Sequence, residues 1–542
     1  MPPRRMTVRA ARLAAAVTAA CLLGVPGAAS AAPAGPPVAE ILGSGSTWAQ
    51  NAVDQWIANV QAQGVNVVFD GTGSAAGRQA FASGTVDFGV SDIGYQGNID
   101  GQEDTSARPY AYLPITAGGT SFPYNIVVGG RRITNLRLSG ETLAKIFTNQ
   151  ITNWDNSAIT DDNNHHALPS LPIITVVPSE GSGTSAMFTE YLNQEFPSLW
   201  KSFNDGQSGM TEYWPRQGPN QVAQDGSSQV MNYIEAPAAN GSIGIDEYSY
   251  PLSAGFPVAQ IENEAGYFTL PSEYNVAVAL TQAQINYDQG SIDYLLENLD
   301  NVYNYSDPRT YPLSSYSYTI MPTSPTDPTM KKSGTPAFPA KAQALAEFLD
   351  YSICEGQEYI GPIGYSALPV NLVEAGFGQI QKIAAAAPQV QISNLNILSC
   401  HNPTFVAGRP DANYLAQIAP EPPLCDKVGY GPCVGVLNAN NNNGLGSTGS
   451  SSGAPPTSAS AASAKASAAS KKGKGSTAAS QSGANAAANA AAVTGVTTLV
   501  PAGQGSSLKD MLAALALLVL VIALAAPPLL ARRRWSLRRR QP

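Results

Sequence analysis

The residues best suited to chemistry are glycines and hydroxyls grouped in three short loops. Residues 181–185 read Gly-Ser-Gly-Thr-Ser, and similar groups stand at residues 43–47 and 71–74. Glycine lets the backbone approach a ligand closely. The first backbone N–H groups of a helix, together with nearby hydroxyls, then donate hydrogen bonds without carrying a formal charge. This chemistry is typical of a pocket for a small oxyanion.

Strands and helices must hold such loops in place. Residues 173–177 form an apolar, strand-like run directly before the loop at 181–185, and an amphipathic helical pattern follows it. A first helix is predicted over about 48–61, with Thr47 near its N-cap. Strand-like runs alternate with helical patterns along the middle of the chain and no internal repeat is found, which indicates an α/β fold.

The N-terminal residues 1–31 predict a secretory signal peptide. They combine a basic start, an apolar stretch and small residues before Ala32. Lipoprotein cleavage at Cys21 is the alternative, although it would leave two leucines at the mature terminus. We therefore expect the chain to be exported.

The C-terminal residues predict attachment to the cell membrane. Residues 437–508 are rich in Ala, Ser, Gly and Asn and predict a disordered tether. Residues 511–531 are apolar and long enough for a transmembrane helix, and the basic tail at 532–542 is expected to stay in the cytoplasm. These features predict a single-pass protein with its N-terminal domain outside the cell.

The remaining residues, about 32–436, are enough for two lobes with separate cores. The formal net charge of −9 argues against nucleic acid as a partner. Four cysteines remain after signal removal and predict two disulfides, with three pairings open: Cys354, Cys400, Cys425 and Cys433. The last three belong to an extension at about 389–436 that follows the two lobes.

The order of several motifs resembles the PstS family, the phosphate-binding proteins of ABC transporters. The matching segments are residues 43–48, 73–77, 84–92, 138–147 with 151–154, 181–185, 241–244 and 364–369. The resemblance covers about residues 39–385. It implies a type II periplasmic-binding-protein fold with a hinge, in which lobe 1 spans about 39–122 and 250–388 and lobe 2 about 123–249. It also implies a monomer that closes on inorganic phosphate.

The family pattern assigns ligand contacts to seven positions of this chain. They are Thr47, Trp48, Ser74, Asp92, Ser182, Gly183 and Thr184. A carboxylate such as Asp92 can accept a hydrogen bond from a P–OH group, whereas fully ionised sulfate has no proton to donate and is repelled. The alternative for Asp92 is a cap on the turn at 93–95.

One position departs from the family. Pro178 stands where family members usually carry an arginine, so a charge-assisted contact of about 1.5 to 3 kcal/mol is missing. We expect Arg78 to compensate in part, with Arg216 as a second candidate; the alternative for both is a plain surface position.

The predicted function is a membrane-tethered, extracellular solute-binding protein that passes phosphate to an ABC permease. The alternative is a surface protein or sensor that keeps the fold with weakened or altered oxyanion binding, and arsenate is an alternative ligand. We expect no enzyme activity, since the loop at 181–185 lacks the Gly-x-Ser-x-Gly frame of a serine hydrolase. We expect no cofactor and no metal, although His165 and His166 follow acidic residues.

Overall fold

The computed structural model describes residues 39–433, apart from residues 100–101, 326, 328–336, 388–389 and 393–394. The predicted signal peptide (1–31), tether (437–508), transmembrane helix (511–531) and basic tail (532–542) lie outside the described residues. Within the described part of the chain, no helix is both long and apolar enough to cross a membrane.

The first lobe is built on a six-stranded mixed sheet, with strand order β14-β6-β19-β3-β1-β2. Its strands are β1 (Ile41–Gly45), β2 (Val67–Gly71), β3 (Phe88–Ser91), β6 (Tyr110–Ser121), β14 (Asp246–Glu247) and β19 (Ser314–Pro322). Strand β1 runs parallel to β2 and β3, while β19 is antiparallel to β3 and β6. The central strands are buried along their length, as expected for a sheet covered by helices.

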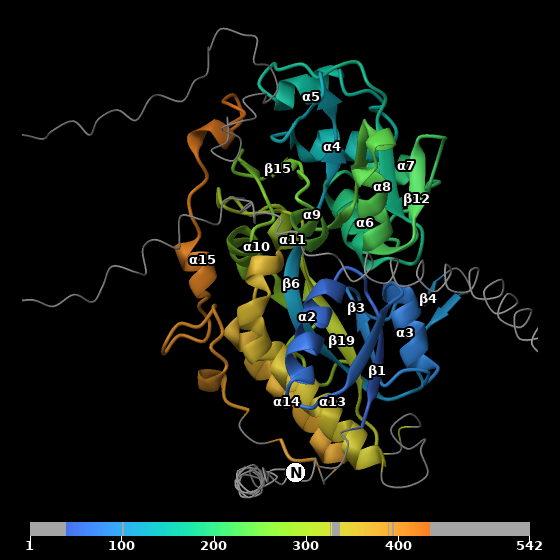
Figure 1. Cartoon of the computed structure of the whole chain (residues 1–542), viewed down its shortest axis with the longest axis vertical. Helices are drawn as coiled ribbons and strands as arrows, with labels where there is room; N and C mark the ends of the chain where they lie inside the picture. The colour runs from blue at the N-terminus through green and yellow to red at the C-terminus, as the bar shows by residue number, and fades with distance from the viewer. Residues whose placement is uncertain are drawn as a thin grey trace, which may run out of the picture. The chain divides into compact units, whose positions relative to one another are not determined.

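Four helices pack on this sheet or on each other (Figure 1). They are α2 (Gln50–Gln61), α3 (Ser74–Ala82), α13 (Ala337–Ile353) and α14 (Val370–Ala386). Helix α3 approaches the sheet closely because Gly77 has no side chain. A Cβ atom there would lie 2.4 Å from the Cα of Gly45 and 2.8 Å from the carbonyl oxygen of Val90. A larger residue at this position would push the helix away from the strands.

The predicted first helix exists but begins slightly later than expected. Helix α2 starts at Gln50, not at about residue 48. The side chain of Ser46, not that of Thr47, accepts the N–H of Ala49 at 3.2 Å. Thr47 therefore does not cap this helix, and its hydroxyl is directed to a different partner across the lobes.

The second lobe is built on a four-stranded sheet with strand order β12-β11-β13-β7. Its strands are β7 (Tyr124–Asn125), β11 (Ile174–Pro178), β12 (Gln221–Gln224) and β13 (Ser242–Gly244). Its helices include α4 (Gly140–Phe147), α5 (Ser157–Asp162), α6 (Gly183–Glu195), α7 (Pro197–Phe203) and α8 (Gly226–Glu235). Phe122, Phe147, Phe188 and Trp214 form an aromatic core here, with ring centroids between 5.0 and 5.9 Å apart in the contacting pairs.

A smaller sheet joins a segment late in the chain to the second lobe. Strand β10 (Arg137–Leu138) pairs with β15 (Gln260–Glu262), which pairs with β16 (Phe268–Thr269). Strands β15 and β16 fall in the range 250–388, which the sequence predicts for the first lobe.

The chain passes directly between the two large sheets at two points. Strand β6 ends at Ser121 in the first sheet and β7 begins at Tyr124 in the second; β13 ends at Gly244 and β14 begins at Asp246. Two short crossings between two α/β lobes are what a hinge requires. The predicted two-lobed α/β architecture is confirmed.

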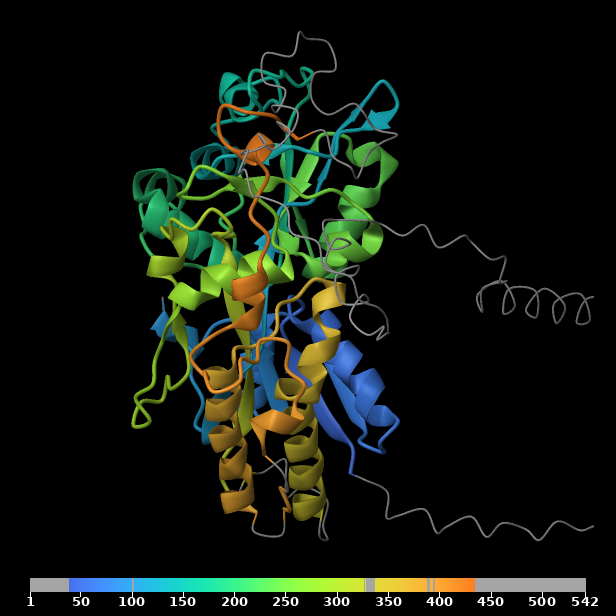
Figure 2. The same cartoon turned by 90° about the vertical axis from the view of Figure 1, so that its left-hand side faces the viewer.

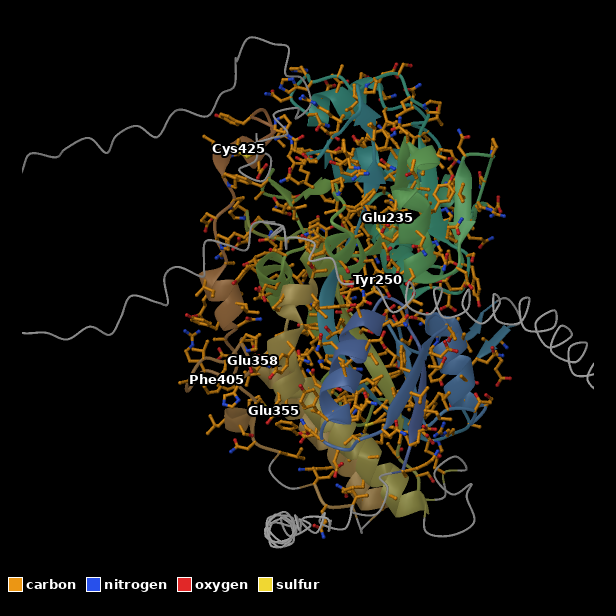
Figure 3. All side chains as sticks on the ribbon, viewed as in Figure 1. Glu235, Tyr250, Glu355, Glu358, Phe405 and Cys425 are labelled. Carbon is orange, nitrogen blue, oxygen red and sulfur yellow. A yellow bond between two sulfur atoms is a disulfide. The ribbon has the colours of Figure 1, made fainter. Side chains whose placement is uncertain are left out.

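A C-terminal segment, residues 395–433, also runs between the lobes, and we call it the strap. Disulfides Cys354–Cys400 and Cys425–Cys433 confirm the predicted number of bridges and settle their pairing. Figures 1 and 2 show the strap in orange, running along one side of the described chain. In Figure 3 it carries the labelled Phe405 near the first lobe and Cys425 near the second.

Hydrogen bonds at each end attach the strap to a different lobe. Near its start, the side chains of Asn402 and Thr404 both donate to the carbonyl oxygen of Leu368 at 3.0 Å. Near its end, Arg137 donates to the carbonyl oxygen of Cys425 at 3.0 Å, and Asn164 donates to that of Gly431 at 3.0 Å. The strap thus begins on the first lobe and ends on the second.

Candidate functional site

Asp92 lies at the carboxyl end of β3, where three hydroxyls converge on its carboxylate. Ser46 donates to both oxygens at 2.8 Å, Ser74 to Oδ2 at 3.1 Å, and Ser317 of β19 to Oδ1 at 2.7 Å. The side chain is almost fully buried, with 2% of the residue exposed. Burial raises the pKa of Asp92, and the three hydroxyls oppose that rise because they stabilise the charged form.

The turn that follows Asp92 finds its hydrogen bonds elsewhere. The N–H of Ile93 donates to the hydroxyl of Ser91 at 3.3 Å, and the N–H of Tyr95 donates to that of Tyr112 at 2.7 Å. The carboxylate of Asp92 therefore accepts hydrogen bonds from the three serine hydroxyls, and the hydroxyls of Ser91 and Tyr112 stabilise the turn.

The beginning of α6 in the second lobe lies directly against this carboxylate. Ser182 is the N-cap and accepts the N–H of Ser185 at 3.5 Å, and Gly183 is the first helical residue. A Cβ atom on Gly183 would lie 2.1 Å from Oδ2 of Asp92 and 2.6 Å from Oγ of Ser74. Only glycine fits between the lobes here. The positive end of the helix therefore faces a negative charge, which is the favourable arrangement.

The structure brings most of the predicted site residues to this junction. Ser74, Asp92 and Gly183 are in direct contact, and Ser182 and Thr184 flank Gly183 as buried residues. We call the meeting of these two loops the junction. A backbone hydrogen bond also closes it, since the N–H of Ala75 donates to the carbonyl oxygen of Gly181 at 3.0 Å.

Thr47 makes a second contact across the lobes. The N–H of Ser227, at the start of α8, donates to Oγ1 of Thr47 at 3.4 Å, and the two hydroxyls lie 3.3 Å apart. Tyr250 donates its hydroxyl to the carbonyl oxygen of Thr47 at 2.5 Å, and Figure 3 labels this tyrosine. The hydroxyl of Thr47 is thereby aimed at the second lobe.

Trp48 offers only its backbone to the junction. Its indole ring is buried in the first lobe against Tyr365, with ring centroids 5.8 Å apart, and its carbonyl oxygen accepts the hydroxyl of Tyr365 at 2.7 Å. No hydrogen bond from the N–H of Trp48 is found among the described residues. That N–H is the group with which Trp48 could contact a ligand.

Arg78 is buried, and two carboxylates hold its guanidinium. Its Nε lies 2.9 Å from Asp104, its Nη2 lies 2.8 Å from Glu212, and its Nη1 donates to Ser91 at 3.0 Å. Burial lowers the pKa of Arg78, but the charges of Glu212 and Asp104 more than offset this and raise it. Glu212 belongs to the second lobe, so this ion pair also crosses between the lobes.

Pro178 and Arg216, the two other positions considered for the missing arginine, lie apart from the ion pairs of Arg78. Pro178 ends β11 beside Gln224 of β12. Arg216 is an exposed residue. The structure thus separates the two cation candidates: Arg78 lies beside Ser91 and Asp92, and Arg216 lies at the surface.

A family model described as a PBP superfamily domain matches residues 30–355, more than half of the chain. The chain belongs to the PBP superfamily. It is similar to the phosphate-binding protein PstS of Methanocaldococcus jannaschii, with 27% identity over 347 residues that cover 63% of this chain and 85% of the relative.

Further relatives are of the same kind. This PBP-superfamily chain is 29% identical over 342 residues to the phosphate-binding protein PstS 2 of Mycobacterium tuberculosis, covering 61% of this chain and 83% of the relative. The predicted resemblance to the PstS family is confirmed. The solved structure of a high-affinity periplasmic phosphate-binding protein, PfluDING, covers 67% of this chain and 97% of its own, with 19% identity and a TM-score of 0.48.

Two further carboxylates of this PBP-superfamily protein lie beside the start of α8. Glu180 accepts the N–H groups of Gly226 and Ser179 at 3.0 Å on Oε2. Asp246 accepts the N–H of Glu247 at 2.8 Å on Oδ1. The other oxygen of each carboxylate is buried and finds no hydrogen-bond partner among the described residues. Burial raises the pKa of both groups, most strongly that of Asp246.

Sequence reasoning missed several residues of this junction. Ser46 stands inside the recognised loop at 43–47 and could have been included. Ser227 follows Gly226 at a helix start, which is the same glycine–hydroxyl signal in a weaker form. Ser317 lies inside a buried strand among other serines and tyrosines, and no local pattern distinguishes it.

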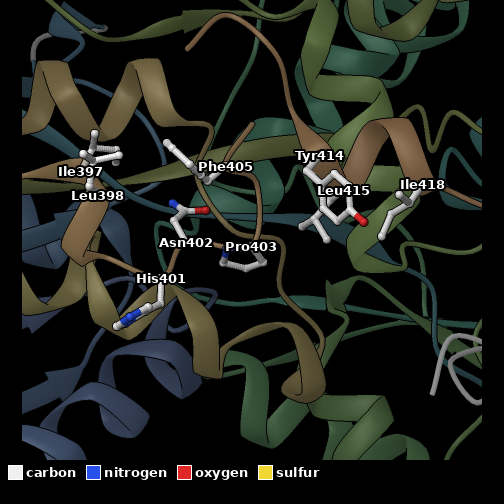
Figure 4. Close-up of a pocket in the computed structure, with 9 residues that line it drawn as sticks. All are labelled: Ile397, Leu398, His401, Asn402, Pro403, Phe405, Tyr414, Leu415 and Ile418. Atoms are coloured by element: carbon white, nitrogen blue, oxygen red, sulfur yellow. The ribbon is translucent and has the colours of Figure 1, made fainter. Parts of the chain in front are cut away.

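A groove of about 560 Å³ lies elsewhere, on the strap (Figure 4). Its lining is largely apolar and consists of Ile397, Leu398, His401, Asn402, Pro403, Phe405, Tyr414, Leu415 and Ile418. The described residues contain no group of three or more His, Cys, Asp or Glu that could hold a metal ion. His165 is exposed and lies 3.3 Å from Asp161.

Proposed function

We propose that this protein is an extracellular, membrane-tethered solute-binding protein that binds inorganic phosphate between its lobes and delivers it to an ABC permease. One observation carries the proposal. The N-terminal end of α6 at Gly183 faces the carboxylate of Asp92 across the lobes. A ligand held at this junction meets donors on one side and an acceptor on the other, which suits an oxyanion that also carries a proton.

The proposed contacts divide into donors and one acceptor. The donors are the hydroxyls of Thr47, Ser74, Ser182 and Thr184 and the backbone N–H groups of Trp48, Gly183 and Thr184. Asp92 is the acceptor for a P–OH group. Sulfate lacks this proton at neutral pH, so Asp92 excludes it by repulsion. The curated PstS relatives support phosphate as the ligand.

Entry of the ligand requires the lobes to separate. Gly183 and Asp92 lie too close together for a phosphate to pass between them. The two short crossings near residues 121–124 and 244–246 allow the lobes to rotate apart and close again. Closure then brings the donors of the second lobe onto a ligand held by the first.

The membrane attachment and the permease remain parts of the proposal. The attachment is supported by the predicted signal peptide at 1–31, the apolar segment at 511–531 and the basic tail that follows it, and the permease by the resemblance to the PstS family. Protease treatment of intact cells should release a fragment that contains the two lobes if the N-terminal domain faces outward.

Calorimetry tests the binding function directly. The full chain, purified in detergent and freed of bound anions, is titrated with phosphate and with sulfate. We expect phosphate to bind with micromolar affinity or better and sulfate to give no heat. Asp92→Asn should weaken phosphate binding and reduce the discrimination against sulfate.

A second function is favoured by one specific observation. The guanidinium of Arg78 is already paired with Asp104 and Glu212, so the junction is poor in free positive charge for an anion. A surface protein or sensor with weakened oxyanion binding would fit this. Absence of binding for both phosphate and arsenate in the same titration would favour that alternative.

A further inference from the structure

Ser317 reaches Asp92 from a stretch of β19 that lies beyond the end of β3. Strand β3 ends at Ser91, which pairs with Tyr318 of β19, so the residues of β19 before Tyr318 extend past their neighbour. Asp92 follows β3 directly, and the hydroxyl of Ser317 donates to its Oδ1 at 2.7 Å. The direction in which Ser317 points therefore depends on what fixes the backbone of β19 beyond β3.

The pairing of β19 with β6, its neighbour on the other side, is irregular at the same place. The register shifts between Ser317 and Tyr318, where β6 accommodates one extra residue, Ile115. A bulge of this kind changes the local twist and the direction of nearby side chains, and bulges are frequent beside functional sites. The orientation of Ser317 thus needs support besides the regular sheet ladder.

The N–H of Tyr316, the residue before Ser317, points toward the side that β3 leaves open. Tyr316 lies opposite Ala117 of β6, whose own N–H and carbonyl group bond to Ser366 and not to β19. Opposite residues of an antiparallel pair either bond to each other or both point outward. Because β6 does not bond the N–H of Tyr316 and the residue is buried, this N–H requires another acceptor.

Glu297 supplies that acceptor from a separate hairpin. Both oxygens of its carboxylate accept the N–H of Tyr316, at 3.0 and 3.2 Å. The hairpin consists of β17 (Gln284–Ile285) and β18 (Glu297–Asn298), which pair antiparallel. A side chain thus takes the place of the strand that β19 lacks beyond β3, and it holds the backbone next to Ser317.

The same hairpin also contacts the turn that follows Asp92. A Cβ atom on Gly94 would lie 2.5 Å from Cδ1 of Leu296, so the neighbour of Glu297 packs closely on this turn. Burial raises the pKa of Glu297; the hydrogen bond from Tyr316 opposes this rise, and the charge of Asp92 adds to it. A neutral carboxyl group still accepts the N–H of Tyr316 through its carbonyl oxygen, so the contact does not require a negative charge.

We infer that Glu297 is a positioning residue for the proposed phosphate site. By holding the backbone of β19 at Tyr316, it keeps the hydroxyl of Ser317 on Oδ1 of Asp92. That hydroxyl in turn helps to fix the rotation of the carboxylate, which the other two serine hydroxyls approach from the N-terminal part of the chain. The inference rests on the proposed function, in which Asp92 accepts the ligand's hydrogen bond. It adds two residues that control affinity without touching the ligand.

A double-mutant cycle on the full chain in detergent tests this inference. Glu297→Ala and Ser317→Ala should each weaken phosphate binding about tenfold in calorimetry, because Asp92 loses the hydroxyl that orients it. If Glu297 acts through Ser317, the variant with both substitutions should bind phosphate no more than about twofold more weakly than Ser317→Ala alone. A residue that supported only the stability of the lobe would give additive losses or no loss of affinity. If Glu297→Ala does not fold, Glu297→Leu, which keeps the volume and removes the acceptor, takes its place in the cycle.

Two further variants separate positioning from loss of stability. Glu297→Gln keeps an oxygen for the N–H of Tyr316 and should hold the phosphate affinity within about threefold of that of the unchanged chain. Asp87→Ala is the matched control, because the buried Asp87 lies beside the other end of β3 and its Oδ2 accepts the N–H of Leu42 at 2.8 Å. This substitution should lower the melting temperature and leave the affinity within about twofold.

The outcomes distinguish this inference from the function on which it rests. Unchanged phosphate affinity in Glu297→Ala, or additive losses in the double variant, overturns the positioning role and leaves phosphate binding standing. A loss in Glu297→Gln or in Asp87→Ala as large as that in Glu297→Ala also overturns it, since affinity would then not follow the acceptor for Tyr316. Absence of phosphate binding by the unchanged chain overturns the proposed function and the inference together.

Discussion

The junction and the strap both connect the two lobes, and they do so by different means. At the junction, the contacts are polar and non-covalent: an ion pair of Arg78 with Glu212, a hydroxyl contact of Thr47 with Ser227, and close packing of Gly183 on Asp92. The strap is a continuous length of chain with a disulfide at each end. Cys354–Cys400 ties the start of the strap covalently to the first lobe, whereas Cys425–Cys433 joins two residues of the strap itself, and hydrogen bonds attach that end to the second lobe.

Two buried arginines show the same contrast in electrostatics. Arg78 at the junction pairs with two carboxylates, which raise its pKa. Arg137 beneath the strap donates to carbonyl oxygens of Asp162 and Cys425 and stacks 4.4 Å from the ring of Phe268, and burial lowers its pKa to about 10. The charge of Arg78 is thus balanced by carboxylates at the junction, whereas Arg137 donates to carbonyl oxygens beneath the strap. We expect changes at the junction to alter binding and changes in the strap to alter stability.

The largest effect is expected from the disulfides of the strap. Cys354–Cys400 closes a loop with a sequence separation of 46, and its loss should reduce the free energy of unfolding by about 4 kcal/mol on the chain-entropy estimate. Cys425–Cys433 has a separation of 8 and should cost about 2 to 3 kcal/mol. Denaturant unfolding of the paired Cys→Ser variants measures both. Phosphate affinity should change less than threefold, and a larger change would place the strap within the binding machinery.

The substitution Gly183→Ala should have the next largest effect. It should change phosphate affinity and leave stability nearly unchanged. The added Cβ of Gly183→Ala would meet Oδ2 of Asp92 at 2.1 Å and keep the lobes apart. We expect phosphate affinity to fall at least a hundredfold, or about 3 kcal/mol, with little change in melting temperature. Gly378→Ala is the control, since α14 leaves open space there. Equal affinities for the two variants would contradict closure at Gly183.

Removal of Arg78 should affect both properties. Arg78→Ala leaves Asp104 and Glu212 without their cation, so we expect a loss of about 2 kcal/mol in unfolding free energy after allowance for the partial exposure of both carboxylates. Phosphate affinity should fall as well, because the cross-lobe ion pair supports closure. The double variant Arg78→Met with Glu212→Gln should recover part of the stability. Arg131→Ala, at an exposed position, is the control.

The smallest effect concerns the carboxyl of Asp426 at the end of the strap. Burial raises its pKa from 3.8 to about 6, so the folded state binds a proton that the unfolded chain releases at lower pH. Stability from this group is present below about pH 4 and is lost as pH rises to about 6. Relative to the unchanged chain, Asp426→Asn should therefore raise the free energy of unfolding by about 1 kcal/mol more at pH 7 than at pH 4. This is a fraction of the roughly 3 kcal/mol that the full pKa shift allows. A variant with unchanged pH dependence of its melting temperature would show that another group dominates.

Local sequence was sufficient for the parts of the site that depend on neighbours in the chain. The loop at 181–185 was expected to precede a helix, and Ser182 does cap α6. Local reasoning was less accurate where a residue near a helix start bonds to a residue far away in the sequence. Thr47 was expected near the N-cap of the first helix, but the N-cap is Ala49, whose N–H donates to Ser46, and Thr47 contacts Ser227, 180 positions away in the sequence.

Charge was the property that sequence reasoning judged least well. Arg78 was weighed as a surface residue or a compensating cation, since nothing near it in sequence reveals its partners. Its carboxylate partners are 26 and 134 positions away. Residues so far apart in the sequence become partners only when the folded chain brings their elements together. A local sequence pattern therefore cannot reveal them.

The sequence by itself determined the α/β class, the glycine and hydroxyl loops at helix starts, the four cysteines beyond the predicted signal peptide and the resemblance to PstS. These features depend on residues that are close together in the chain, so a local sequence pattern is enough to predict them. Tertiary structure alone decided the disulfide pairing, the convergence of Ser46, Ser74 and Ser317 on Asp92, and the passage of the strap from one lobe to the other. Those features join residues from separate elements, and only the packing of the folded chain brings them within reach of one another.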